Sequence, residues 1–154
     1  MTETHAGGCQ CGAVRFRVDG PLGRASICHC RMCQKATGGF FGPYVGGLNL
    51  RWTRGAPAKF QSSNKVKRGF CKDCGTPMTF EFGEFVELSI GAFDEPARIT
   101  PVVQMRVESR MPWFAELAGL EAIPPTQTPW QEGIVSHQHP DHDTDAWTPI
   151  SPPA

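Results

Sequence analysis

The chain has 154 residues, a length that favours one domain of ordinary size. Its 17 glycines and 14 prolines exclude a large helical bundle, because both residue types interrupt helix interiors. The 15 basic and 15 acidic side chains balance. A chain without a basic excess has no built-in attraction for nucleic acid or an anionic membrane, so we expect neither as a partner.

The expected location follows from the hydrophobic pattern and the N-terminal residues. The start, MTETHAGG, lacks the basic and apolar regions of a signal peptide, and the apolar runs are far shorter than a membrane span. We therefore expect a soluble, cytoplasmic protein. The sequence leaves the oligomeric state open, with a homodimer as one option.

Alternating apolar and polar residues predict short strands along the chain. In Ala13–Val18 the side chains of Val14, Phe16 and Val18 fall on one face and two arginines on the other, as in a half-buried strand. Similar runs bounded by glycine, proline or asparagine are Phe40–Val45, Leu48–Trp52, Met78–Phe82, Phe85–Ile90 and Val102–Val107. The pattern predicts a mainly β fold, a meander of short antiparallel strands.

Two short helices complete the predicted elements. One covers Arg31–Thr37 and ends at the following glycines, and the other follows Pro112 through Trp113–Ala118, because proline suits a first helical turn. Both are too short to fold alone. We expect them to pack on the strands.

The composition changes at Pro124, which predicts a domain of residues 1–123 and an extension of residues 124–154. The extension holds seven of the 14 prolines and no lysine or arginine. It also contains His137, His139 and His142 among three aspartates, which could form a second metal centre or an acid–base group. Without a fixed spacing, we interpret this segment as an exposed polar tail.

Seven cysteines dominate the chemistry of the sequence. An odd number at close spacing suits a disulfide framework poorly, so metal ligation by thiolates is the better interpretation. Two pairs, Cys9/Cys11 and Cys71/Cys74, supply the four soft ligands of a closed, tetrahedral structural zinc site. Free core cysteines or a disulfide are the alternatives for these pairs.

The other three cysteines, Cys28, Cys30 and Cys33, form a C-x-C-x-x-C pattern. Three thiolates can hold one zinc ion and leave a coordination position open, which distinguishes catalytic from structural zinc sites. His29 could be a fourth ligand, but a residue directly between two ligands usually turns away. An iron–sulfur cluster is the weaker choice without a fourth nearby cysteine. Spacing alone leaves mixed groupings of the seven open.

The charge of the three-cysteine site indicates its reaction class. Three thiolates and one Zn²⁺ sum to −1, which makes a weak Lewis acid that can still hold an incoming thiol as thiolate. Thiol chemistry is therefore the natural class. Basic residues near the cysteines could lower thiol pKa values or bind carboxylates, or could be a solvated face. They are Arg31, Lys35, Lys65, Lys67, Arg68 and Lys72.

Five motifs together resemble one family. GGCQCG, CHCRMCQKATGG, RGFCKDCGTPMTF, GAFDEP and ESRMPWF occur in this order, from about Gly7 to Leu120. The chain resembles the glutathione-dependent formaldehyde-activating enzyme family, which is related to centromere protein V. The resemblance implies an Mss4-like zinc-binding fold with two zinc ions. The outer pairs would hold the structural zinc and the middle triplet the catalytic zinc.

The resemblance also implies an activity and a substrate. The family's named reaction condenses glutathione with formaldehyde to S-hydroxymethylglutathione, which makes it a carbon–sulfur lyase in reverse. We expect a small thiol such as glutathione as the partner, with Cys28, Cys30 and Cys33 as the catalytic residues. After Pro101 the family often has histidine where this chain has Gln104. The alternative is a zinc-stabilised protein-binding module without catalytic activity, using its sheet surface.

Overall fold

The computed structural model describes residues 3–148, and the remaining residues of the predicted domain and extension, 1–2 and 149–154, lie outside it. The strands are β1 (Thr4–Gly8), β2 (Arg15–Asp19), β3 (Ser26–Cys28), β4 (Gly42–Gly46), β5 (Leu50–Arg54), β6 (Ala58–Gln61), β7 (Val66–Phe70), β8 (Pro77–Phe82), β9 (Phe85–Ser89) and β10 (Val103–Met105). The helix α1 spans Arg31–Thr37. Short 3₁₀ helices lie at Ile90–Ala92, Pro96–Arg98, Val107–Ser109, Phe114–Gly119, Pro125–Gln127 and Pro129–Gln131.

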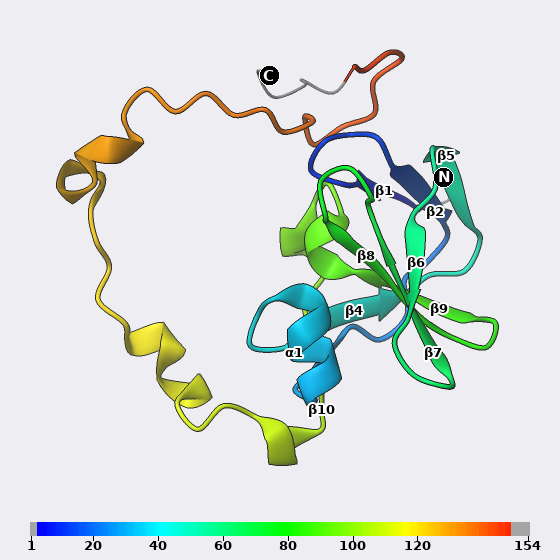
Figure 1. Ribbon diagram of the computed structural model, residues 1–154, viewed down its shortest axis with the longest axis horizontal. Coiled ribbons are helices and arrows are strands. Elements are labelled where there is room, and N and C mark those ends of the chain that lie inside the picture. The colour runs from blue at the N-terminus through cyan, green and yellow to red at the C-terminus, as the bar shows by residue number, and fades with distance from the viewer. Residues whose placement is uncertain (1–2, 149–154) are drawn as a thin grey trace.

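The strands form two sheets (Figure 1). The smaller sheet has the antiparallel order β1-β2-β5. The larger has the order β10-β3-β4-β9-β8-β7-β6. Strands β6 to β9 follow one another as an antiparallel meander, and β4 pairs antiparallel with both β9 and β3. At the edge β10 runs parallel to β3, which brings residues 103–105 beside the strand that carries Cys28.

The predicted fold class, mainly β with one or two short helices, is confirmed. The α1 helix has the predicted bounds, and Gly38 follows it in the left-handed conformation at φ 68°. The segment after Pro112 forms a 3₁₀ helix at Phe114–Gly119. No helix within residues 3–148 combines the length and the apolar character needed to cross a membrane.

The prediction of one antiparallel meander is wrong in two respects. The chain divides its strands between two sheets, and the pair β10–β3 is parallel. The predicted strand Val102–Val107 is also shorter than expected, because Arg106 adopts a left-handed φ of 57° directly after β10. The alternation pattern does not predict β1, β3, β6 or β7.

The main core contains residues of both sheets. Phe16 and Val18 of β2 are fully buried together with Val45 of β4, Met78 of β8 and Leu88 of β9. Each such side chain contributes roughly 1.5–3 kcal/mol through burial. A second, smaller cluster contains Cys28, Cys33 and Tyr44, with Cys30 and Phe80 packed on it. The alternation of side chains along β4 therefore supplies Val45 to one cluster and the neighbouring tyrosine to the other.

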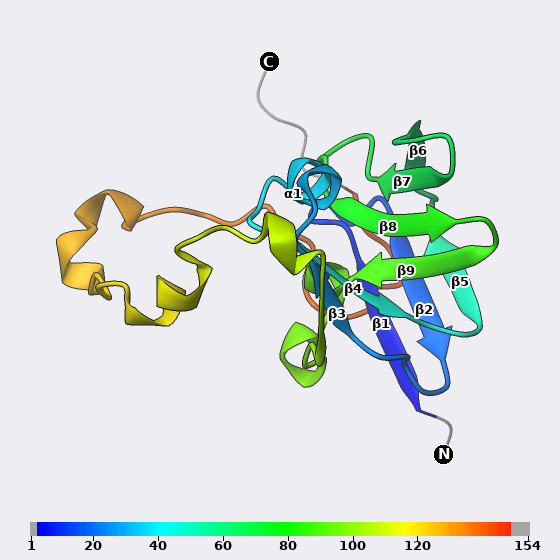
Figure 2. The same cartoon turned by 90° about the horizontal axis from the view of Figure 1, so that it is seen from below.

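Beyond β10 the chain leaves the two sheets and later returns to them. Figures 1 and 2 show residues 115–138, which we call the arm, running away from the sheets and coming back to β1 and β2. Residues 139–147, which we call the strap, then lie against the turn between these strands: the His139 N–H donates to the Gln10 carbonyl at 2.8 Å. The Trp147 Nε1–H donates to the Cys11 carbonyl at 2.6 Å.

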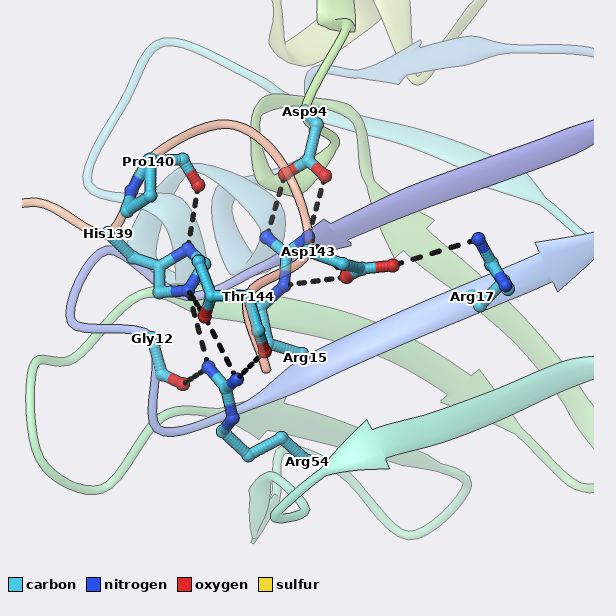
Figure 3. Close-up of polar contacts among 9 residues, drawn as sticks. All are labelled: Gly12, Arg15, Arg17, Arg54, Asp94, His139, Pro140, Asp143 and Thr144. Atoms are coloured by element: carbon cyan, nitrogen blue, oxygen red, sulfur yellow. Dashed lines mark hydrogen bonds and ion pairs between the residues drawn. The ribbon is translucent and has the colours of Figure 1, made fainter. Parts of the chain in front are cut away.

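Three arginines, Arg15 and Arg17 of β2 and Arg54 of β5, contact the strap (Figure 3). The buried Arg15 donates to both carboxylate oxygens of Asp94, at 2.7 and 2.6 Å, and to Asp143 of the strap at 2.8 Å. Arg54 of β5 donates to the Thr144 carbonyl at 2.6 Å and also contacts the His139 ring. Part of the predicted polar tail is thus packed on the first domain, and the predicted boundary at residues 123–124 stays a prediction.

Candidate metal centres and active site

Cys9, Cys11, Cys71 and Cys74 come together as predicted from their spacing. Their four Sγ atoms all lie within 4.8 Å of one another. The Sγ atoms of Cys9 and Cys11 are 3.6 Å apart, and those of Cys11 and Cys71 are 3.8 Å apart. All seven cysteines of the chain are free thiols, so the alternative of a disulfide is wrong.

The backbone around these cysteines turns so that both pairs face one point. Gly12 follows Cys11 with φ 75°, and Gly75 follows Cys74 with φ 79°, a conformation that favours glycine. The Val14 N–H points at the Cys9 Sγ at 3.2 Å. Each of these backbone features lies within a few residues of its own cysteine pair. The short spacing within each pair was therefore enough to predict that the four cysteines group together.

The spacing of the sulfur atoms fits a tetrahedral metal ion. With zinc–sulfur bonds near 2.3 Å, tetrahedral ligands lie about 3.8 Å apart, close to the separations of 3.6 and 3.8 Å between these sulfur atoms. Burial raises the pKa of Cys11 and of Cys71. Burial also acts on Cys74, but hydrogen bonds with Thr76 outweigh it and lower the pKa of Cys74 to about 6. A bound cation would supply the charge that lets all four ionise.

Cys28, Cys30 and Cys33 form the second group, with all three Sγ atoms within 4.8 Å of one another. Cys28 ends β3, and Cys33 lies in the first turn of α1. Cys30 is the N-cap of that helix, and its Sγ accepts the Cys33 N–H at 3.4 Å. Burial raises the pKa of Cys33 to about 12, although Arg68 opposes this. The helix start therefore positions two of the three sulfurs.

Arg68 of β7 connects this group to the interior of the larger sheet. Its Nη2 donates to the Cys33 Sγ at 3.3 Å and its Nη1 to the Tyr44 hydroxyl at 2.8 Å. The guanidinium lies over the Phe80 ring, 4.8 Å from its centre. Arg68 is 6% exposed and committed to these partners, so it acts as a fixed positive charge beside the thiols.

A cavity of about 510 Å³ lies next to the residues that contact the three-cysteine group. Tyr44 and Arg68 line this cavity and also contact Cys33, while none of the three cysteines is among its lining residues. Arg31, Met32 and Lys35 of α1 line one side, and the strands line the other. The strand and turn residues are Tyr44, Phe60, Ser62, Arg68, Gly69, Phe70, Gly75, Pro77 and Thr79. A volume of this size is in the range of small-molecule sites, and its wall combines apolar surface with cationic groups.

His29 lies apart from the sulfurs. Its Nε2 lies 3.0 Å from Gln104 Oε1, and its ring packs edge-on against Phe41 and Phe114. The Gln34 side chain donates to its carbonyl at 2.8 Å. The grouping of Cys28, Cys30 and Cys33 does not include it. Gln104 therefore meets this buried histidine through the parallel β10–β3 pair.

The remaining predicted residues lie elsewhere. His137 and His142 are exposed, while His139 is buried against Trp147 in the strap, and none of them joins a metal-binding group within residues 3–148. Lys65, Lys67 and Lys72 are exposed, and Lys72 lies near the Asp73 carboxylate.

Sequence reasoning missed Tyr44, which packs on Cys28 and Cys33. Its contact with Arg68 joins β4 to β7 across two intervening strands, so no short motif carries it. The available signal was composition, since this is the single tyrosine of the chain.

The comparison with solved structures supports the fold. A solved structure of a protein from Rhodobacter sphaeroides is similar to the chain, with a TM-score of 0.51 and 23% identity over 65% of this chain and 99% of that chain. At this identity the likeness concerns the fold. No curated protein is significantly similar to the chain.

The family comparison covers the part of the chain that carries both cysteine groups. The model described as glutathione-dependent formaldehyde-activating enzyme matches residues 4–109, more than half of the chain. The mainly β fold and the two cysteine groups that could hold metal ions are those expected of its Mss4-like members. The chain belongs to the glutathione-dependent formaldehyde-activating enzyme family.

Proposed function

We propose that this chain is a zinc-dependent carbon–sulfur lyase and synthase that joins a small thiol to a small aldehyde and cleaves the same adduct. Glutathione and formaldehyde are the first pair to test. One observation carries the proposal: three cysteine sulfurs lie together next to Tyr44 and Arg68, and these two residues line a cavity of about 510 Å³ that two cationic side chains of α1 also line. A three-ligand group beside a pocket is the arrangement of a catalytic rather than a structural zinc site.

The two cysteine groups have different proposed roles. Cys9, Cys11, Cys71 and Cys74 would hold a structural zinc, since four thiolates complete the tetrahedron. Cys28, Cys30 and Cys33 would hold the catalytic zinc, which supplies one free coordination position where a substrate sulfur is kept as thiolate. A site with net charge −1 lowers the pKa of water little, so the addition of a thiol is favoured over hydrolysis.

The residues around the pocket supply binding and charge. Arg31 and Lys35 present cationic groups that suit the carboxylates of an anionic thiol such as glutathione. Met32, Phe60 and Phe70 provide apolar surface along the same cavity. The positive charge of Arg68 lies beside the Cys33 sulfur. This charge would offset part of the negative charge of the three thiolates. The carboxylates of the substrate would thus bind at α1, and its sulfur would reach the free coordination position beyond Tyr44 and Arg68.

We further propose a cellular compartment and a domain organisation for the enzyme. Seven free thiols at close spacing favour a reducing compartment, which supports the expectation of a cytoplasmic protein. We also propose that residues 1–123 form the metal-binding domain and that residues 124–154 form its extension. All seven cysteines lie in the first part.

The test measures zinc content, thiol binding and turnover on the same zinc-loaded preparation. We expect two zinc ions per chain, calorimetric binding of glutathione, and exchange between glutathione and its hydroxymethyl adduct, seen by NMR, that is faster than in buffer. Arg31→Ala should weaken glutathione binding roughly tenfold by loss of a charged contact. Lys67→Ala is the matched control, because this lysine is exposed on β7 and lines no part of the cavity.

Two results would contradict the proposal. One is adduct exchange no faster than in buffer together with no binding of glutathione or cysteine at millimolar concentration. The other is a single zinc per chain with Cys28, Cys30 and Cys33 unligated under reducing conditions. Either result would leave the zinc-stabilised binding module, for which Leu48, Phe82 and Phe85 offer exposed apolar surface on the strands and turns.

A further inference from the structure

The buried hydroxyl of Tyr44 has an unused hydrogen at the edge of the candidate active site. We propose that this hydroxyl donates a hydrogen bond to the substrate oxygen that becomes negative when the carbon–sulfur bond forms. The proposal rests on the proposed function and adds a catalytic residue to it.

The strand register places the Tyr44 hydroxyl near the three cysteines. In the β3–β4 pair, Tyr44 lies opposite Ser26 and Gly42 lies opposite Cys28. The tyrosine ring extends back along β4 over Gly42, so that a Cβ atom added to Gly42 would lie 2.7 Å from the hydroxyl oxygen. The phenol therefore points toward the end of β3 that carries Cys28, and the absence of a side chain at Gly42 makes room for it.

The hydrogen bonds of Tyr44 leave its own proton available. Arg68 Nη1 donates to the hydroxyl oxygen at 2.8 Å, which makes that oxygen an acceptor. Within residues 3–148 no hydrogen bond uses the phenol hydrogen. The other terminal nitrogen of the same guanidinium donates to Cys33 Sγ at 3.3 Å. One rigid, planar group thus holds the phenol oxygen and a cysteine sulfur side by side.

The residues packed around Tyr44 restrict the direction in which its hydroxyl can donate a hydrogen bond. Tyr44 is 2% exposed, yet it lines the cavity that also contains Arg31 and Lys35. The Phe80 ring packs beside both Tyr44 and the Arg68 guanidinium and fills the space on the opposite side. The cavity is then the free direction for the donor. A donor fixed in a poorly hydrated site stabilises a developing negative charge without reorganisation.

The proposed step balances in atoms and charge. The substrate thiol loses its proton to water and adds through a sulfur lone pair to the aldehyde carbon, forming the carbon–sulfur bond. The carbonyl π pair moves to the oxygen, where the Tyr44 O–H stabilises it, and water returns one proton to give the hydroxyl of the adduct. Cleavage follows the same path in reverse. No oxidant or reductant takes part.

The first test removes only the hydroxyl. Tyr44→Phe should slow adduct formation and cleavage by about 100-fold, the effect of losing one donor to a developing oxyanion. The variant should keep its zinc content and its affinity for S-methylglutathione, which has no oxygen at the reacting carbon. Phe82→Leu is the control, since that ring is half exposed and lines no part of the cavity.

The second test observes binding directly and does not depend on turnover. Tyr44 is the single tyrosine, so ¹³Cζ-tyrosine labelling gives one resonance from this site. We expect S-hydroxymethylglutathione to shift that resonance more than S-methylglutathione does. Equal shifts from the two probes, or Tyr44→Phe turnover within threefold of the unmodified chain, would overturn the inference. Turnover no faster than in buffer in the unmodified chain would instead refute the proposed function itself.

Discussion

Asp94→Ala should be among the most destabilising single changes in the protein. The Asp94 carboxylate accepts two hydrogen bonds from Arg15, at 2.7 and 2.6 Å, and the Arg15 side chain is only 4% exposed. Removing one partner of a buried ion pair costs 3–5 kcal/mol, because the other charge stays buried without compensation. Asp143 still contacts Arg15 at 2.8 Å, so we expect the lower end, about 3 kcal/mol.

The measurement is urea unfolding followed by far-ultraviolet circular dichroism, at a fixed concentration of free zinc because metal binding adds to the apparent stability. The same loss should lower the melting temperature by about 10 °C. Asp143→Ala is the matched control: this carboxylate is 45% exposed, so its pair with Arg15 should contribute about 1 kcal/mol or less. Equal losses in the two variants, or a loss below 1 kcal/mol for Asp94→Ala, would refute the reasoning.

Cys71→Ser should give insoluble or unfolded protein, because it opens the closed four-cysteine group; a soluble variant with unchanged melting would contradict this. Cys30→Ser should keep its fold, since serine also caps helices, but should lose one zinc per chain in elemental analysis and lose adduct exchange; retention of both zinc ions would count against it. Burial lowers the pKa of His139, so the unfolded chain protonates this ring first and stability should fall as the pH drops from 7 through 6.5. Urea midpoints at pH 7.5 and 5.5 should therefore differ less in His139→Gln than in the unmodified chain, and an identical pH dependence would exclude this histidine as its source.

The strands that the sequence predicts best are those whose alternation reflects one buried face. Phe16 and Val18 alternate with arginines on β2, and the structure buries both. The pattern fails for β1, where Gly7 and Gly8 have a low intrinsic preference for strands. They are glycines for a tertiary reason: a Cβ on Gly7 would collide with Phe16 and with the backbone around Ala92. Close packing between segments that are distant in the sequence produces no alternating pattern of apolar and polar residues.

The cysteine groups could be predicted because metal ligands close together in sequence constrain the local backbone. The contact of Arg68 with Tyr44 could not, because it depends on four adjacent strands of the larger sheet and on Phe80, which packs against both side chains. The strap was also beyond prediction, since Arg15 meets a carboxylate 128 residues later. Composition correctly marked that segment as polar, and only the fold shows which charges it meets.

The position of the strap at the end of the chain sets an order for biosynthesis. Cys74 is the last cysteine of the four-cysteine group, and His139, where the strap begins, follows 65 residues later. At 5–20 residues per second a ribosome needs roughly 3–13 s to make this stretch. During that interval the turn at Gln10 and Cys11 emerges without the contacts that His139 and Trp147 later make. The nascent chain can therefore assemble the four-cysteine group before translation supplies the segment that packs on its N-terminal turn.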